Sequence, residues 1–201
     1  RDSDGNYINW HTNESIDLDF KTEFEVISSN PDTTPPEFKN LELSKDRFNV
    51  TNGDKTFYLS ADLTDDISGF ISESSGSNIN LSWRSPSGDQ YVNASMGAYM
   101  YEHLDQNPDW QDIIINADNN NISFENIEVT IPQYSEEGLW TLGYISASDS
   151  VGNYLSIHNA FDENGNPIKG AYENQYGELI DLGFKTEFEV ISSNPDTTPP
   201  E

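Results

Sequence analysis

The sequence predicts an all-β protein that folds as an antiparallel β-sandwich, and three observations carry this prediction. Apolar and polar residues alternate with a period of two in many short segments, as in strands that bury one face. Clusters of Gly, Asn, Asp, Ser and Pro separate these segments and are typical of turns. No segment keeps a convincing helical period for more than about two turns. Short strands at this spacing, with turn signals between them, indicate a sandwich.

The expected strands follow one another along the chain. They are residues 20–27, a strand around Leu41 within 38–50, then 56–63, 78–84, 90–94, 123–131, 139–147, 154–157 and 182–191. Residues 20–27 (FKTEFEVI) and 56–63 (TFYLSADL) show the alternation most clearly. The Asn52-Gly53 pair before 56–63 indicates a tight turn, because both residues tolerate positive φ. Pro132 ends the strand 123–131, since proline lacks the amide donor of a strand.

The later strands are recognised by their aromatic residues and by the loops between them. Trp83 in 78–84 and Trp140 in 139–147 alternate inward, so we expect both in the core. The sequence SPSGD at 85–89 is a turn, and DSVGN at 149–153 is a loop between two strands. Two stretches, 98–121 and the polar, Gly-rich 161–177, show no clear period and are expected to be insertions.

A nearly identical internal repeat defines the domain organisation. Residues 16–37 and 180–201 differ only at Asp19 and Gly183, with an offset of 164 residues (180 − 16). The match extends upstream, where residues 2–7 align with 149–154 and His11 aligns with His158. We therefore expect residues 1–29 to be the C-terminal strands of a preceding repeat, and 30–37 to be a proline-rich, stiff linker. Residues 38–192 then form one complete repeat, and 193–201 form the next linker.

The composition excludes several functions. The 36 acidic residues against 9 basic ones give a net charge of −27, the wrong sign for binding nucleic acid or an anionic membrane surface. No apolar run approaches the length needed for membrane insertion. Signatures of a catalytic nucleophile, a phosphate loop or a zinc site are absent from the sequence, so we expect no enzymatic activity. Asp and Glu instead recur singly or in pairs among Asn, Ser and Gly, which is the composition of oxygen-ligated calcium sites.

Three short motifs recur at intervals along the complete repeat. They are DTTPP at 32–36 before its first strand, DDISG at 65–69 after the second, and DSVGN at 149–153 between the last two. In this order they resemble the bacterial Ig-like tandem repeats of large calcium-dependent surface adhesins, such as those of biofilms. The resemblance covers residues 38–201. The offset of 164 residues exceeds the length of about 100 residues usual for Ig-like domains, and the excess falls in the two insertions.

The resemblance implies a fold, a location and a role. The fold is an Ig-like sandwich, and the location is the outside of a bacterial cell. The role is that of a rigid extender or an adhesive module whose partners are the neighbouring repeats of the same chain. Calcium is the implied structural cofactor.

The strand order of such a sandwich predicts where calcium binds. The loops 65–69 and 149–153 return to the end at which the linker meets the first strand. This places Asp32 and Glu37 beside Asp65, Asp66 and Asp149. Five carboxylates repel one another strongly, and one or two calcium ions would relieve that repulsion. The alternative is that these aspartates cap turns by accepting hydrogen bonds from their own backbone.

Three further loops have a weaker calcium-like spacing. They contain Asp2 and Asp4, then Asp105, Asn107 and Asp109, and finally Asp162 and Asn164. The last loop resembles the start of an EF-hand, but Pro167 stands where that motif has glycine. The alternative for each loop is an ordinary turn.

Two other functions stay open on the sequence alone. A carbohydrate-binding module would use exposed aromatic rings, and Trp110, Tyr101 and Tyr172 lie in the two insertions. Cell-surface or matrix glycans would then be partners. A strand-exchanging assembly subunit would use residues 20–27, which are identical to 184–191 and could complete the sandwich of a neighbouring chain.

Overall fold

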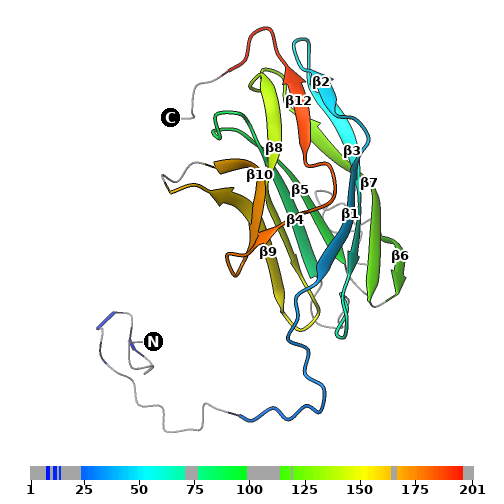
Figure 1. Ribbon diagram of the computed structural model, residues 1–201, viewed down its shortest axis with the longest axis vertical. Helices are drawn as coiled ribbons and strands as arrows, with labels where there is room; N and C mark the ends of the chain where they lie inside the picture. The colour runs from blue at the N-terminus through cyan, green and yellow to red at the C-terminus, as the bar shows by residue number, and fades with distance from the viewer. Residues whose placement is uncertain are drawn as a thin grey trace. The chain divides into compact units, whose positions relative to one another are not determined.

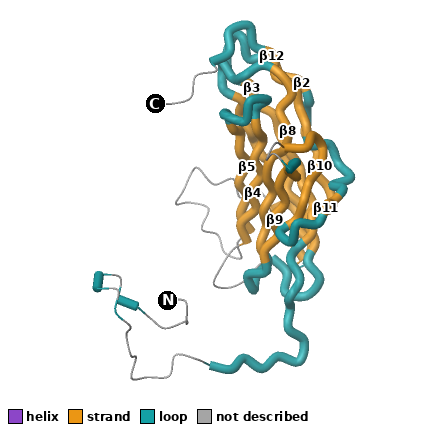
Figure 2. Tube along the Cα trace, turned by 60° about the vertical axis from the view of Figure 1, so that its left-hand side comes forward, coloured by secondary structure: helices purple, strands orange, loops and turns teal. Residues whose placement is uncertain are grey.

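The chain consists of two compact units, Arg1–Pro31 and Asp32–Glu201. The computed structural model describes residues 8–9, 11–12, 14, 24–70, 77–98, 114–118, 120–163 and 167–196. Figure 1 shows that strands form the body of the second unit. Figure 2 shows that loops cover the two ends of this body.

The second unit is all-β in its described part, as the sequence predicts. Its strands are β1 (Glu37–Leu43), β2 (Arg47–Asn49), β3 (Lys55–Thr64), β4 (Ser77–Arg84), β5 (Tyr91–Ala98), β6 (Ile114–Asp118), β7 (Asn121–Ile131), β8 (Gly138–Ser148), β9 (Tyr154–Phe161), β10 (Pro167–Asn174), β11 (Leu179–Ile180) and β12 (Glu187–Ile191). Along β3, Phe57, Leu59, Ala61 and Leu63 are buried while the residues between them are not, so the period of two reports a real buried face.

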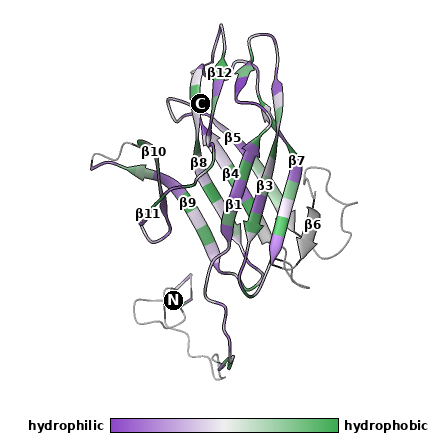
Figure 3. Cartoon of the chain, turned by 45° about the vertical axis from the view of Figure 1, so that its right-hand side comes forward, coloured by the Kyte–Doolittle hydropathy of each residue, from purple (hydrophilic) through white to green (hydrophobic). Residues whose placement is uncertain are grey.

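Two sheets form a β-sandwich around one core. The smaller sheet has the order β1-β3-β7-β6. The larger has the order β11-β10-β9-β8-β12-β2, and β4 joins it by pairing with β8 and β5. The strand pairs are antiparallel except for β12 and β2, which run parallel. Figure 3 shows hydrophobic and hydrophilic bands alternating along the strands, as expected when each sheet buries one face.

β8 is the central strand of the larger sheet. One of its edges pairs with β4, and the other edge is shared, with β12 along residues 138–141 and β9 along 144–148. Where the two neighbours meet, the Leu142 amide donates to the Thr186 carbonyl (2.9 Å), and Asn159 Nδ2 donates to the Leu142 carbonyl (3.1 Å). The backbone of β8 therefore stays hydrogen-bonded where its partner changes from β12 to β9. The chain between these two partners forms β10 and β11, which extend the sheet beyond β9.

Phe188 of β12 lies in the middle of an aromatic cluster. Its ring centroid is 5.4 Å from that of Phe57, 5.5 Å from Phe48, 5.9 Å from Trp140 and 6.2 Å from Trp83. These separations are in the favourable range for aromatic pairs. The prediction that both tryptophans belong to the core is confirmed, because Trp83 and Trp140 are fully buried.

The first unit contains the upstream copy of the β12 sequence. Of the strand expected at 20–27, the structure describes residues 24–27, and these form no strand. Phe24 and Val26 are 83% and 76% exposed, whereas their counterparts Phe188 and Val190 are 1% and 0% exposed. The strand prediction is wrong for these residues, because a strand needs a hydrogen-bonded neighbour and none of the described residues provides one.

The insertion expected at 161–177 contains a strand rather than loop alone. β10 pairs with β9 and β11 pairs with β10, so the insertion widens the larger sheet. β6 lies within the other insertion, 98–121, of which residues 99–113 and 119 are outside the described residues. The short β2 was also not expected as a separate strand, because Phe48 is its one buried residue.

Candidate metal site

Three segments form the N-terminal end of the sandwich, where β1 begins. They are linker residues 32–36, the β3–β4 loop from Asp65, and the β8–β9 loop of residues 149–153. Ser150 ties the two loops together, because its amide donates to the Gly69 carbonyl (2.7 Å) and its hydroxyl to the Ser68 carbonyl (2.8 Å). The linker joins them through Asp32, which accepts a hydrogen bond from the Ser68 amide (2.8 Å).

Asp32, Asp65 and Asp66 bring carboxylate oxygens within 4.8 Å of one another. Asp65 is buried, Asp32 is half-buried and Asp66 is exposed. Two negative charges within this distance repel by at least about 3 kcal/mol if the effective dielectric constant is about 20. Hydrogen-bond donors reduce the cost, but a cation removes it. The group therefore has the composition and spacing to hold a metal ion.

The two carboxylate oxygens of Asp65 are in different environments. Oδ2 accepts hydrogen bonds from the Gly69 amide (2.6 Å), the Ile67 amide (3.3 Å) and the Ser68 hydroxyl (3.4 Å). Oδ1 is buried and has no hydrogen-bond partner in the described part of the chain, in a side chain that is only 8% exposed. Leaving a charged oxygen buried without a partner is costly, and a bound cation would satisfy it.

Asp149 holds the equivalent place in its own loop, but both of its oxygens are satisfied. Oδ1 accepts from the amides of Val151 (3.0 Å), Gly152 (2.6 Å) and Asn153 (2.8 Å), and Oδ2 accepts from Asn153 Nδ2 (2.6 Å). The structure leaves Asp149 outside the carboxylate group. For this predicted ligand it favours the alternative, in which the aspartate caps its turn.

Thr34 and Ser68 hold the exposed side of the group together. The Thr34 hydroxyl lies 2.6 Å from Asp66 Oδ1 and 3.2 Å from Asp32 Oδ1, so it bridges the two carboxylates. Burial alone would raise the pKa of Asp32, but hydrogen bonds from Ser68 and Thr34 outweigh burial and lower the pKa below its usual value. Asp32 is therefore ionised at neutral pH, as a metal ligand must be.

Of the remaining predicted ligands, those that the structure describes are not part of this group. Glu37 forms an ion pair with Lys39 on β1. Asp162 is exposed just after β9. Asp2, Asp4, Asp105, Asn107, Asp109 and Asn164 lie outside the described residues.

Tyr172 belongs to the core and not to a sugar-binding surface. Its side chain is buried on β10, and its hydroxyl donates to Thr186 Oγ1 (2.9 Å). A ring that stacks on a sugar must expose a face, so the structure contradicts the expected role of Tyr172. Trp110 and Tyr101, the other aromatic residues of that hypothesis, lie outside the described residues.

Sequence reasoning missed the residues that organise the group. Each of the three motifs contains one of these residues, namely Thr34, Ser68 and Ser150. The metal prediction considered only the carboxylates of the motifs. The available signal was the pairing of Asp with Ser or Thr at short spacing, which is typical of side chains that bond to nearby backbone.

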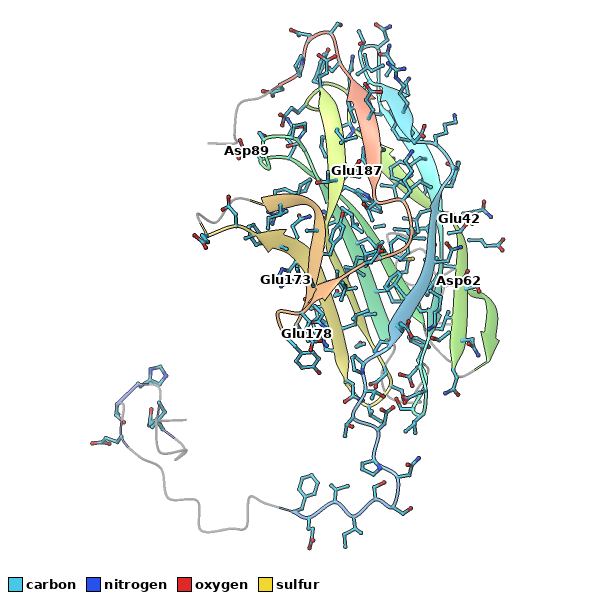
Figure 4. All side chains as sticks on the ribbon, in the orientation of Figure 1. Glu42, Asp62, Asp89, Glu173, Glu178 and Glu187 are labelled. Atoms are coloured by element: carbon cyan, nitrogen blue, oxygen red, sulfur yellow. The ribbon has the colours of Figure 1, made fainter. Side chains whose placement is uncertain are left out.

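Acidic side chains cover much of the sandwich, so acidity alone does not mark the site. Figure 4 labels Glu42, Asp62, Asp89, Glu173, Glu178 and Glu187, which come from both sheets and from the loops. Among the described residues, only Asp32, Asp65 and Asp66 bring three such ligand atoms together. No helix in that part of the chain is long and apolar enough to cross a membrane.

Comparison with protein-family models, curated proteins and solved structures finds no significant match to this chain. The resemblance to adhesin repeats therefore stays a prediction carried by the three motifs.

Proposed function

We propose that this chain is a non-catalytic repeat module of an extracellular bacterial surface protein. In this proposal, calcium at Asp32, Asp65 and Asp66 fixes the linker to the sandwich, so that the module acts as a stiff extender. The observation that carries the proposal is the buried Oδ1 of Asp65, which has no hydrogen-bond partner among the described residues and lies beside two further carboxylates. The nearly identical repeat at an offset of 164 residues supports a tandem array.

Calcium fits the group better than magnesium does. Calcium takes six to eight oxygen ligands at about 2.3–2.6 Å, so two of its ligands can be about 5 Å apart, against about 4 Å for magnesium. Ligand oxygens within 4.8 Å of one another fit around one calcium ion, and magnesium sites in proteins usually use only one or two carboxylates, whereas this group offers three. Three carboxylates supply three to six oxygens, and backbone carbonyls or water complete the shell.

A bound ion would stiffen the module because its ligands come from two segments. Asp32 belongs to the linker, whereas Asp65 and Asp66 follow β3. Pro35 and Pro36 already restrict the linker backbone between Asp32 and β1. Fixing Asp32 to the β3–β4 loop would leave the linker little freedom to swing, which is what an extender requires.

Calcium titration with melting curves tests the proposal on the 201-residue chain. At a free calcium concentration of about 100 times the dissociation constant, binding stabilises the folded state by about 2.7 kcal/mol. For a domain of this size we expect the Tm to rise by about 5–10 °C. Chelator should reverse the rise.

Asp66→Asn is the most informative variant. Asp66 is exposed, and asparagine keeps an oxygen that can accept from Thr34. Without calcium, removing one of three mutually repelling charges should leave the Tm equal or slightly higher. With calcium, the variant should lose most of the gain. Losing stability in both conditions would mean that Asp66 has a structural role only.

Asp54→Asn is the matched control. Asp54 is also an exposed aspartate that accepts one hydrogen bond, from the Gln133 amide (2.7 Å), but it lies outside the carboxylate group. This variant should keep the full calcium response. A Tm that calcium does not change in the unmodified chain would refute the proposed metal site.

A further inference from the structure

The C-terminal end of the sandwich holds the next copy of the linker. Asp196 is the counterpart of Asp32 at the same offset (196 − 32 = 164), and both lie in the sequence SSNPDTTPPE. The Asp196 amide donates to the Tyr134 carbonyl (2.8 Å), and Gln90 Nε2 donates to the Asp196 carbonyl. Gln90 is itself held, because its Oε1 accepts from the Glu136 amide (2.8 Å). The linker backbone is thus fixed to the β4–β5 and β7–β8 loops.

The hydrogen bonds described above for Asp196 and for Asp32 involve different atoms of the two copies of this aspartate. At the C-terminal end, the amide of Asp196 donates to Tyr134 and its carbonyl accepts from Gln90. At the N-terminal end, the contacts are made by the two carboxylate oxygens of Asp32, which face Thr34 and Ser68. One aspartate can therefore make both sets of contacts at the same time.

We infer that in a tandem array each linker aspartate is bonded to two repeats at once, its backbone to the repeat before it and its carboxylate to the repeat after it. The inference rests on the proposed function, because it requires consecutive copies of this module. It adds the docking surface and its occupant: the C-terminal end of one sandwich receives the N-terminal end of the next repeat in the same chain.

The geometry of one residue brings the two ends close together. The hydrogen bond to Tyr134 and the hydrogen bond from Ser68 are each 2.8 Å long. The span of an aspartate from its amide to its carboxylate is under 5 Å, so the Tyr134 carbonyl and the next repeat's Ser68 amide are at most about 10 Å apart. Over this distance only the aspartate itself fits between the two groups. The loop that carries Tyr134 must therefore lie in contact, or nearly so, with the loop that carries Ser68 of the next repeat.

The two ends also carry complementary apolar side chains. Tyr91 and Tyr134 line a pocket of about 360 Å³ beside Asp196 and are 50% and 47% exposed. At the N-terminal end, Ile67 lies next to the carboxylate group and is 42% exposed. Val151 is exposed there too, but the upstream copy has Asp4 at this position, so Ile67 is the residue we assign to the contact. Docking would cover Ile67 with the tyrosines.

Pulsed-electron distance measurement on a two-repeat chain tests the inference. Adding a second copy of residues 38–201 after Glu201 continues the repeat in register, since Glu201 is the counterpart of Glu37. The chain has no cysteine, so Asn93→Cys in both copies gives one spin label at an exposed position of each β5. In calcium we expect one narrow distribution of label-to-label distances. A broad distribution in calcium would overturn the inference.

Gln90→Ala in the first copy removes the side chain that holds the Asp196 carbonyl, and it should widen the distribution at least twofold. The control is Gln175→Ala, since the Gln175 side chain also accepts a backbone amide, from Ser156 (3.2 Å), but lies on the β10–β11 turn. It should leave the distribution narrow. An unchanged distribution in Gln90→Ala would also overturn the inference.

Calcium binding by the 201-residue chain separates this inference from the proposed function. If that chain binds calcium while the two-repeat labels give a broad distribution, docking is wrong and the metal site stands. If calcium does not bind but the distribution is narrow and widens in Gln90→Ala, docking stands and the metal site is wrong.

Discussion

Two aspartates at equivalent loop positions have different environments, and the difference lies in a single oxygen. Asp149 gives both oxygens to donors of its own loop. Asp65 gives Oδ2 to its loop, and Oδ1 has no described partner. A carboxylate that only caps a turn has both oxygens satisfied by hydrogen bonds and needs no bound ion. Asp65 keeps one buried oxygen that no described donor satisfies, so the candidate site is centred on this residue.

Asp149→Ala should separate capping from metal binding. It removes the acceptor for three amides and one side-chain amide, so we expect a loss of about 3 kcal/mol in the free energy of unfolding. The rise in Tm on adding calcium should persist, because Asp149 is outside the carboxylate group. Chemical denaturation with and without calcium measures both quantities. Loss of the calcium response in a folded variant would show that Asp149 is a ligand after all.

Phe188 and Phe24 form a matched pair in identical sequence contexts. Phe188→Ala removes the ring at the centre of the aromatic cluster and should cost about 3–5 kcal/mol of unfolding free energy. Phe24→Ala alters an exposed ring and should change stability by less than about 0.5 kcal/mol. Urea denaturation compares the two. A large loss in Phe24→Ala, accompanied by dissociation of an oligomer in sedimentation, would favour strand exchange between chains.

At the scale of elements, a buried tyrosine anchors the segment of β10 and β11, which lies between β9 and β12 in the chain. Tyr172 anchors β10 through Thr186, the residue that also accepts from the Leu142 amide at the split edge of β8. Burial raises the pKa of the Tyr172 hydroxyl above its usual value, and the nearby Glu187 carboxylate raises it further. The folded state therefore holds the Tyr172 proton more tightly than the unfolded state does.

This pKa shift predicts a loss of stability in alkali. The contribution is complete below the unfolded pKa of about 10 and is lost as the pH rises through the folded pKa, since the unfolded state binds fewer protons there. Tyr172→Phe cannot ionise, so its stability should fall less between about pH 9 and 11. Tyr176→Phe is the control, because Tyr176 is 70% exposed in the same insertion. Equal alkaline slopes for the unmodified chain and Tyr172→Phe would contradict the assignment.

The sequence predicts elements well where burial alternates and poorly where it does not. β3 and β12 were located because every second residue faces the core. β10 was not, since Tyr172 is its one clearly buried residue among 171–174. At residues 24–27 the sequence predicts a strand that the structure does not contain. Their alternation is as strong as that of β12, but no described neighbour pairs with them, so the pattern alone does not make a strand.

At the scale of the whole molecule, strand order predicts which loops meet, but it does not predict what each carboxylate accepts. The convergence of Asp32, Asp65 and Asp66 follows from the linker and the β3–β4 loop reaching the same end of the sandwich. The exclusion of Asp149 and Glu37 depends on hydrogen bonds and on an ion pair with Lys39, which are set by local side-chain geometry. The sequence repeat shows that Asp32 and Asp196 are equivalent positions. Only the structure shows that the hydrogen bonds at the two ends of the sandwich involve different atoms of this residue.

The acidity of the chain, with a net charge of −27, would favour divalent cations at the linkers of the proposed array. In the proposed array, consecutive modules of so acidic a chain would repel each other, and one cation at each linker would offset part of that repulsion where the modules are closest. A cation at the N-terminal end of the sandwich would then lie where the repulsion between the proposed modules is strongest.

A crystal of the 201-residue chain grown with calcium, and measured for anomalous scattering, tests the metal site most directly. We expect an anomalous peak about 2.3–2.6 Å from oxygens of Asp32, Asp65 and Asp66, with Asp65 Oδ1 among them. Density for water or for a lysine ammonium group in that position, in a crystal saturated with calcium, would contradict the account.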